Sequence, residues 1–462
     1  MLTKFKFLLF QSVKFYKYLI YKEQNLKAVR AKHYFGGIHP RAEKKLSSGQ
    51  PIETAPLPQT VAVSCTQSAG CPAEPVVQTG QTVKEGELIA KAAGAVSSDA
   101  FASVCGTVSD IRDLTGTGGK TEKFIFIQSD GKKDKAYLPP LQSPSPEEIK
   151  QRIKDCGIVG LGGAGFPTAV KVSPTEPVDT LIINGAECEP YLTCDYRLML
   201  EHADEIVRGA RYVATALGAE NLVIGIEANK RDCAEKFEPF DDLKVVLLKK
   251  KYPLGGEKQL IYCTTGKKLG RGKLPFEIGV VVQNVATCFA VCQAIELGKP
   301  LYERVVTVSG RAVKTPKNVL VRIGTPIEEL IAFCGGEISR PKKAVLGGPM
   351  TGVALANYDG YVHKTTSGIV LMTEDEACTE EPTPCLNCGK CADVCPMHLM
   401  PMNTAFYSAA GDFEAAAKYG NVRSCIECGA CEYICPARRP LIQAIRKTKA
   451  ALRAAEKGEK ND

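Results

Sequence analysis

The chain has 462 residues, 44% of them hydrophobic and 24% charged, a composition typical of a globular protein with several cores. Its 20 cysteines do not indicate a disulfide framework, because such frameworks belong to small secreted chains. The formal net charge is +8, with Lys and Arg concentrated at both ends. Because these basic ends flank the globular part, we expect no nucleic-acid partner, and an anionic membrane surface or an acidic redox partner is favoured.

Residues 1–29 form a basic extension. No stretch reaches the roughly 18 apolar residues of a spanning helix, and neither a signal-peptide core nor its cleavage site is present. Lys22 and Glu23 can be encoded as AAG-GAG, a ribosome-binding consensus, and Leu26 as TTG. One hypothesis is therefore that the natural chain begins near Leu26; the alternative is an amphipathic helix on a membrane surface. We expect a protein facing the cytosol, with any membrane association peripheral.

Residues 30–135 are predicted to form an all-β domain of short strands separated by Gly, Pro and Asp turns. Residues 75–90 and 102–108 resemble the barrel-sandwich fold of lipoyl and biotinyl domains. Those domains present a modifiable lysine in their central hairpin, but residues 95–99 contain none. We therefore expect a scaffold and not a swinging arm.

Residues 136–300 are predicted to form an α/β domain with a mainly parallel sheet. After a Pro- and Ser-rich linker, Ser145 and Glu148 predict a helix start with a capping box, and residues 201–217 predict a further helix. Four apolar runs predict buried strands at residues 180–183, 222–226, 244–248 and 279–282.

A smaller α+β unit is predicted for residues 301–355, with strands at 304–308 and 344–346 and a short helix at 326–333. Two cysteine runs follow within residues 370–440, and a basic, amphipathic tail over residues 441–462 ends the chain.

The two cysteine runs have the spacing of bacterial ferredoxins, in which the fourth cysteine of each run ligates the other cluster. Zinc ribbons use pairs of cysteines without this third and fourth member, so two [4Fe–4S] clusters are favoured over zinc. The remaining cysteines are interpreted as small buried hydrophobes. One predicted ligand set is Cys385, Cys388, Cys391 and Cys435, and the other is Cys425, Cys428, Cys431 and Cys395.

A glycine-rich loop, residues 160–168, follows the capped helix and precedes Lys171. It is neither a Walker A motif nor a Rossmann fingerprint, so alone it is a weak sign of phosphate or nucleotide binding. Three further loops follow predicted strands, at residues 184–191, 252–258 and 283–287. Since ligands bind beyond the carboxyl ends of parallel strands, the four loops together favour a binding site over ordinary solvated loops.

The four loops resemble the FMN- and NADH-binding loops of the flavoprotein subunit of respiratory complex I. The domain order is closer still to the C subunits of Rnf (Rsx) complexes, which are ion-translocating ferredoxin:NAD+ oxidoreductases. The motifs at residues 36–40 and 70–75 also match that family, and the resemblance covers residues 30–450. Ala186 and Gly256 replace acidic residues of the complex I protein, and its single-cluster motif is absent.

The resemblance implies a multidomain fold, α/β plus all-β: a barrel-sandwich domain, a Rossmann-like FMN/NADH domain, a β-grasp (SLBB) domain and a ferredoxin-like α-helical domain with two [4Fe–4S] clusters. The residues that would hold FMN are Gly160, Gly162, Gly163, Lys171, Asn184 and Asn284. Those that would face NAD(H) are Phe166, Glu187, Glu189 and Glu257.

The resemblance implies a peripheral electron-transfer subunit, on the cytoplasmic side of the cell membrane, of a translocase that oxidises ferredoxin and reduces NAD+. Integral-membrane and ferredoxin-like subunits would be its partners and would carry out ion translocation. One alternative is a soluble subunit built from the same modules, as in cobalamin reductase or proline reductase electron transfer. Another is a docking subunit with clusters but an inactive flavin site.

Overall fold

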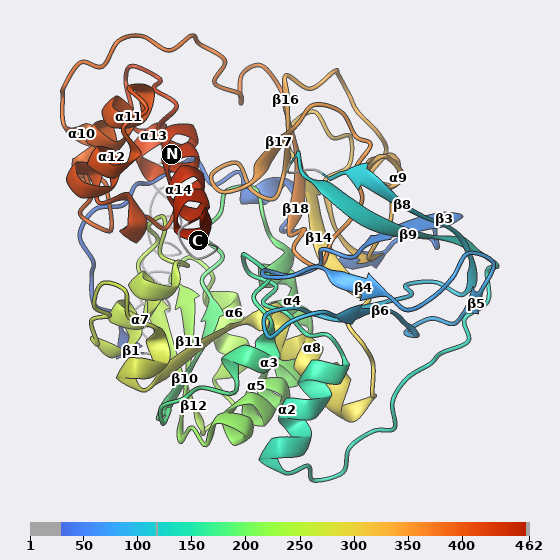
Figure 1. Cartoon of the computed structure of the whole chain (residues 1–462). Helices are drawn as coiled ribbons and strands as arrows, with labels where there is room; N and C mark the ends of the chain where they lie inside the picture. Colours follow the sequence, from blue (N-terminus) through green and yellow to red (C-terminus); the bar gives the residue numbers. More distant parts are fainter. Residues whose placement is uncertain (1–28, 117–118, 459–462) are drawn as a thin grey trace, which may run out of the picture.

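A computed structural model describes residues 29–116 and 119–458, which form four β-sheets and a C-terminal group of helices (Figure 1). The hypotheses about a natural start near Leu26 and about a membrane-surface helix concern residues outside these ranges. Within the described part of the chain, no helix has both the length and the apolar character needed to cross a membrane.

A parallel five-stranded sheet forms the α/β domain, in the order β1-β12-β11-β10-β13. All four predicted strands are confirmed; they are rich in Val, Ile and Leu because helices cover both faces of the sheet. The strands are β1 (Val29–Arg30), β10 (Thr180–Gly185), β11 (Asn221–Glu227), β12 (Leu243–Leu248) and β13 (Val280–Asn284).

Side chains alternate between the two faces of this sheet. Leu181 and Ile183 of β10 share a core with one group of helices, whereas Ile182 packs with α7 (Glu257–Thr265). The first group comprises α2 (Pro146–Asp155), α3 (Thr168–Lys171), α4 (Cys194–Glu201), α5 (Ala203–Leu217), α6 (Arg231–Phe237) and α8 (Val285–Glu296). A 3-10 turn, η2 (Pro275–Ile278), precedes β13.

Two predicted helix starts can be compared with the structure. The capping box of α2 is confirmed, with Glu148 and Ser145 bonded reciprocally. The predicted helix at residues 201–217 was placed two residues too early, because α4 ends at Glu201 and α5 begins at Ala203. His202 lies between them with non-helical dihedrals (φ −132°, ψ 33°), and its Nδ1 lies 2.6 Å from Glu205 Oε2.

The all-β domain is a sandwich of a four-stranded and a three-stranded sheet. Of the stretch 102–108, which resembles part of the barrel-sandwich fold, only the residues from Gly106 onward form a strand. A side chain at Gly106 would collide with the Gln128 backbone. The first sheet contains β3 (Thr60–Ser64), β9 (Thr121–Ser129), β8 (Gly106–Thr115) and β5 (Thr82–Val83); the second contains β4 (Ala73–Pro75), β6 (Leu88–Ala92) and β7 (Ala100–Phe101).

A mixed six-stranded sheet, in the order β17-β16-β18-β14-β15-β2, forms the SLBB-like unit with helix α9 (Ile327–Phe333). The edge strand β2 (Ile52–Thr54) comes from the segment before the sandwich and pairs with β15 in parallel. The other strands are β14 (Glu303–Ser309), β15 (Lys317–Arg322), β16 (Lys343–Leu346), β17 (Val353–Leu355) and β18 (Gly368–Met372).

The C-terminal helices lie above the α/β domain and beside the β16–β17 hairpin (Figure 1). Hydrogen bonds from Tyr252 and Gln259 join the α/β domain to them. The elements are α10 (Lys390–Asp393), α11 (Pro401–Ala409), α12 (Phe413–Gly420), η3 (Val422–Ser424), α13 (Ala430–Tyr433) and α14 (Leu441–Gly458).

Candidate cofactor-binding site

The carboxyl ends of β10 and β13 place two asparagines next to each other. Asn184 and Asn284 are register partners on these parallel strands. Asn184 Nδ2 donates to the Gly255 carbonyl over 2.9 Å, and Asn284 Nδ2 donates to Asp195 Oδ2 over 2.7 Å. The predicted loops at residues 184–191, 252–258 and 283–287 therefore meet at one edge of the sheet.

The glycine-rich loop folds over this edge. The Gly160 N–H donates to the Phe166 carbonyl over 2.9 Å and closes the loop. A Cβ atom on Gly162 would lie 2.7 Å from Asn284 Nδ2, whereas one on Gly163 would meet no atom within 4 Å. Gly162, Gly163 and the ring of Phe166 are exposed. The loop thus presents open backbone beside Asn284, a surface suited to the close approach of a phosphate or a flat ring.

The glycine-rich loop is held in place from behind by two buried side chains. The Leu161 N–H donates to Thr287 Oγ1 over 3.0 Å, and Arg304 of β14 donates to the Leu161 carbonyl over 3.3 Å. Arg304 also donates to the Val305 carbonyl, and all of its contacts are with carbonyl groups. The SLBB-like sheet therefore positions the loop and places a buried positive charge behind it.

Lys171 and Glu257 form an ion pair of 2.7 Å at the mouth of the site. Both side chains are partly exposed, so the pair is accessible to a ligand. Lys171 was predicted to hold FMN and Glu257 to face the nucleotide, and the structure brings the two together. An anionic ligand group near Lys171 would have to share this cation with Glu257.

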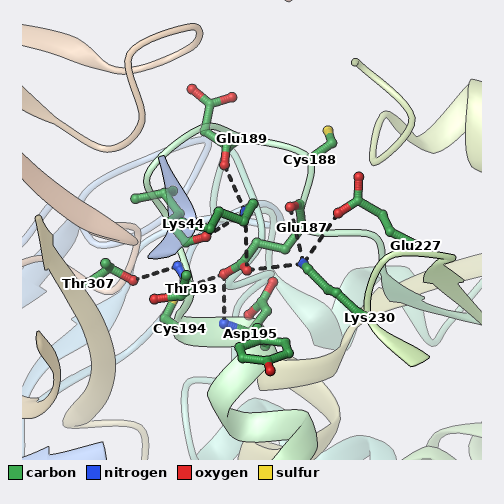
Figure 2. A network of polar contacts seen from close by, with 12 residues as sticks. Lys44, Glu187, Cys188, Glu189, Thr193, Cys194, Asp195, Glu227, Lys230 and Thr307 are labelled. Atoms are coloured by element: carbon green, nitrogen blue, oxygen red, sulfur yellow. Dashed lines mark hydrogen bonds and ion pairs between the residues drawn. The ribbon is translucent and has the colours of Figure 1, made fainter. Parts of the chain in front are cut away.

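Glu187 lies at the centre of a buried charge network (Figure 2). Its Oε1 accepts from the Asp195 N–H over 2.9 Å, and its Oε2 lies 3.4 Å from Lys44 Nζ and 3.2 Å from Lys230 Nζ. Lys230 also pairs with Glu227 at 3.4 Å. Because both oxygens already have partners, Glu187 can act on a ligand through its charge and by positioning its loop.

The two lysines of this network respond differently to burial. Burial lowers the pKa of Lys44, and the charge of Glu187 only partly opposes this change. Burial also acts to lower the pKa of Lys230, but Glu187 and Glu227 outweigh it and raise the pKa above its ordinary value. Lys230 is therefore the firmly charged partner of the two carboxylates.

Asp195 forms no ion pair with a Lys or Arg among the described residues. Burial and the nearby charge of Glu187 raise its pKa to about 6, although the Asn284 hydrogen bond opposes the rise. Its carboxyl group is therefore poised to exchange a proton near neutral pH.

The Glu189 side chain points away from Glu187 (Figure 2). Its Oε1 accepts from the backbone N–H groups of Met350 and Thr351 over 2.7 and 3.1 Å. Burial raises the pKa of this carboxyl group. Glu189, predicted to face NAD(H), thus lies between the loops at the sheet edge and the β16–β17 hairpin.

Sequence reasoning missed the partners that come from distant segments. Lys44 lies in the 3-10 helix η1 (Lys44–Leu46), Glu227 is the last residue of β11, and Lys230 directly precedes α6. None of them belongs to a recognisable motif. Asp195 had a faint signal, since it lies in the first turn of α4, shortly after the acidic loop.

The two cysteine runs have equivalent backbone conformations. Asn387 and Glu427 have φ of 52° and 55°, and His398 and Arg438 have φ of 54° and 53°. In each run the second residue after the first cysteine donates its N–H to that cysteine's sulfur, over 3.4 Å from Asn387 and 3.3 Å from Glu427. Such bonds orient thiolates around a shared inorganic core.

One pocket is lined by one predicted ligand set, Cys395, Cys425, Cys428 and Cys431, and by apolar side chains such as Ile442 and Ile445. We call it the second cluster site. Four thiols around an apolar cavity match the donor set of a [4Fe–4S] cluster. The first cluster site, Cys385, Cys388, Cys391 and Cys435, is more open, since its first two cysteines are exposed.

Four family profiles match successive parts of the chain: the RnfC barrel sandwich hybrid domain over residues 32–132, the Nuo51 FMN-binding domain over 153–293, the SLBB domain over 305–354 and the 4Fe-4S dicluster domain over 384–439. With the observed sheets and helices, they confirm the predicted fold class. They also support an FMN-binding domain and a dicluster domain.

Three relatives match most of the chain, and each is the C subunit of a redox complex. The one from the proton-translocating ferredoxin:NAD(+) oxidoreductase complex of Clostridium ljungdahlii is 44% identical over 93% of this chain and 96% of its own length. Its counterpart from the Na(+)-translocating ferredoxin:NAD(+) oxidoreductase complex of Acetobacterium woodii is 40% identical over 90% and 96%. The third, from the ion-translocating oxidoreductase complex of Rhodobacter capsulatus, is 42% identical over 83% and 76%.

The Asp195→Asn variant tests the raised pKa of Asp195 through its effect on the free energy of unfolding. The raised folded-state pKa means that the carboxyl group favours folding below its ordinary pKa of 3.8 and that this contribution is lost as the pH rises through about 6. Asn cannot ionise and still accepts from Asn284. The variant should gain stability over the wild type between these pH values and remain roughly 1–3 kcal/mol more stable above them.

Urea unfolding from pH 4 to 8, followed by circular dichroism, measures this difference. Asp242→Asn is the matched control, because the Arg211 hydrogen bond lowers the pKa of Asp242 and its replacement should change stability slightly in the opposite direction. A constant difference between D195N and the wild type across this pH range would contradict the prediction.

Proposed function

Because this chain belongs to the family of C subunits of ion-translocating oxidoreductase complexes of the Rnf type, we propose that it relays electrons between a ferredoxin-type donor and NAD(H) through FMN and two [4Fe–4S] clusters. One observation carries the proposal. The second cluster site lies directly against the strand-end loops, which are residues 184–191, 252–258 and 283–287. The Tyr252 hydroxyl of one loop donates to the Cys428 carbonyl over 2.6 Å. A flavin-type site and a cluster site in contact can form a continuous electron path.

The proposed FMN residues fit an anionic, flat ligand. Gly162 and Gly163 would offer backbone N–H groups, while Gly160 would keep the loop closed through its bond to Phe166. Lys171 would offer a cation to the phosphate, and Asn184 and Asn284 would offer amide groups. FMN, when bound, supplies the conversion between a two-electron hydride and single electrons. The chain would contribute binding, exclusion of water and a proton-holding carboxyl group at Asp195.

The proposed nucleotide residues divide into two groups. Phe166 is 41% exposed and free to stack, and Glu257 lies at the mouth of the site. Glu187 and Glu189 are held by protein contacts, so they would shape the nucleotide loop and supply charge.

The exposure of the two cluster sites suggests their order along the electron path. The second cluster site faces the α/β domain, and the first presents Cys385 and Cys388 to solvent. We therefore place the first cluster toward the partner subunits, which would carry out ion translocation in the membrane. The chain itself would lie peripherally, on the cytoplasmic side. The match with relatives from such complexes over nearly their whole length favours this assignment over a soluble cobalamin- or proline-reductase subunit.

NADH titration of the anaerobically purified, cofactor-loaded chain tests the electron path. NADH should bleach the flavin and the iron–sulfur absorbance together, because the flavin passes single electrons to the clusters. Dithionite reduces clusters without a nucleotide site and serves as the control. Cluster bleaching by dithionite alone, with no flavin bound, would favour the docking-subunit alternative.

Cysteine replacements test the crossed ligand sets. Cys435→Ala should remove the cluster held by the first run and lower iron from roughly eight to roughly four atoms per chain. Combining it with Cys388→Ala should cause no further loss, whereas combining it with Cys428→Ala should remove nearly all the iron. Cys378→Ala, at an exposed cysteine outside the runs, is the control. The reverse pairing of losses would show uncrossed ligation.

Gly163→Val tests the glycine-rich loop as a ligand surface. No protein atom lies within 4 Å of the added Cβ position, so the apo chain should keep its thermal stability. A flavin resting on this backbone would be displaced, and FMN affinity should fall by about tenfold or more. Gly49→Val, at another open position far along the chain, should bind FMN normally. Unchanged FMN affinity in G163V would move the flavin away from this loop.

A further inference from the structure

Tyr252 occupies the junction between the strand-end loops and the second cluster site. Its backbone pairs with Ile38 in both directions over 2.9 Å, and the adjacent Gly37 N–H donates to the Val394 carbonyl over 2.7 Å. Val394 directly precedes the cluster residue Cys395. The Tyr252 ring is buried with Ile38 and Ala430, so its position is fixed by elements from both sides of the junction.

The Tyr252 hydroxyl donates to the Cys428 carbonyl over 2.6 Å. Burial raises the pKa of this hydroxyl far above its ordinary value, and the charge of the Glu189 carboxylate raises it further. The hydroxyl therefore keeps its proton. The hydroxyl therefore donates to the Cys428 carbonyl while the charge of Glu189 acts on it.

The β16–β17 hairpin also lies between Glu189 and the loop of Cys428. Glu189 accepts from Met350 and Thr351, and the Met350 carbonyl lies 2.6 Å from the position of a Cβ on Gly429, the residue after Cys428. Arg446 of α14 donates to the Thr351 carbonyl over 3.3 Å. The hairpin thus holds the Glu189 carboxylate close to the Cys428 loop, on the side of the Tyr252 hydroxyl.

We propose that Tyr252 is a positioning residue that tunes the reduction potential of the second cluster and couples it to nucleotide binding near Glu189. The inference rests on the proposed function. A donor directed at the peptide of a cluster ligand stabilises the more negative, reduced cluster and so raises its potential. A nucleotide that alters the Glu189 carboxylate changes the charge that acts on the hydroxyl and shifts that potential.

The first test needs no nucleotide. In the Cys385→Ala chain, from which the first cluster is removed, a redox titration followed by electron paramagnetic resonance reports the second cluster alone. Tyr252→Phe removes only the hydroxyl and should lower the midpoint potential. The matched control is Tyr262→Phe, at a half-buried tyrosine of α7 in the same domain, which should not change it. Equal potentials in Y252F and Y262F would overturn the proposal.

The second test adds saturating NAD+ as the probe, with its affinity measured separately by calorimetry. NAD+ should shift the potential of the second cluster in the Y262F control, and Y252F should lose this shift while binding NAD+ within about twofold of the control. A shift that persists in Y252F would refute the coupling. If NAD+ does not bind at all, the nicotinamide part of the proposed function and the coupling both fall, while the tuning by Tyr252 is decided by the first test.

Discussion

The ion pair between Glu187 and Lys230, joined by Lys44, is the interaction on which the site depends. It ties the loop after β10 to the start of α6 and to η1, three segments widely separated along the chain. Removing the cation of a buried ion pair costs a protein several kcal/mol of folding stability. The three segments are therefore held together strongly. Glu189 lies on the same loop as Glu187, and Asp195 of α4 donates its N–H to Glu187, so both take their positions from this arrangement.

The segment before the sandwich domain gives the molecule its rigidity. β1 pairs with β12 of the α/β sheet, β2 pairs with β15 of the SLBB-like sheet, and Gly37 bonds to the backbone beside Cys395. A single stretch of about 25 residues therefore contacts three other units. Their relative positions are set by backbone hydrogen bonds and not by flexible linkers, as an electron path between fixed centres requires.

Sequence reasoning succeeded where a local pattern carries the information. Apolar runs predicted the four buried strands, the Ser145 capping box predicted α2, and cysteine spacing predicted the paired runs. It could not find β1 and β2, because two or three residues leave no periodic signal and pair only with distant strands. It also could not find Lys44, nor could it see that Glu189 bonds to the β16–β17 hairpin. Charge partners across domains depend on tertiary packing, which no short window of sequence contains.

The unequal burial of the two cysteine sets has a consequence for how the protein matures. The second cluster site has two buried cysteines, Cys395 and Cys431, and is covered in part by α14 and by the contacts of Gly37 and Tyr252, so iron and sulfide would have to enter before the C-terminal helices dock. Cys385 and Cys388 stay open to solvent after docking. Cofactor insertion and folding would thus be linked at the second cluster site and independent at the first cluster site. A cluster damaged by oxygen could be repaired in the folded protein only at the first cluster site.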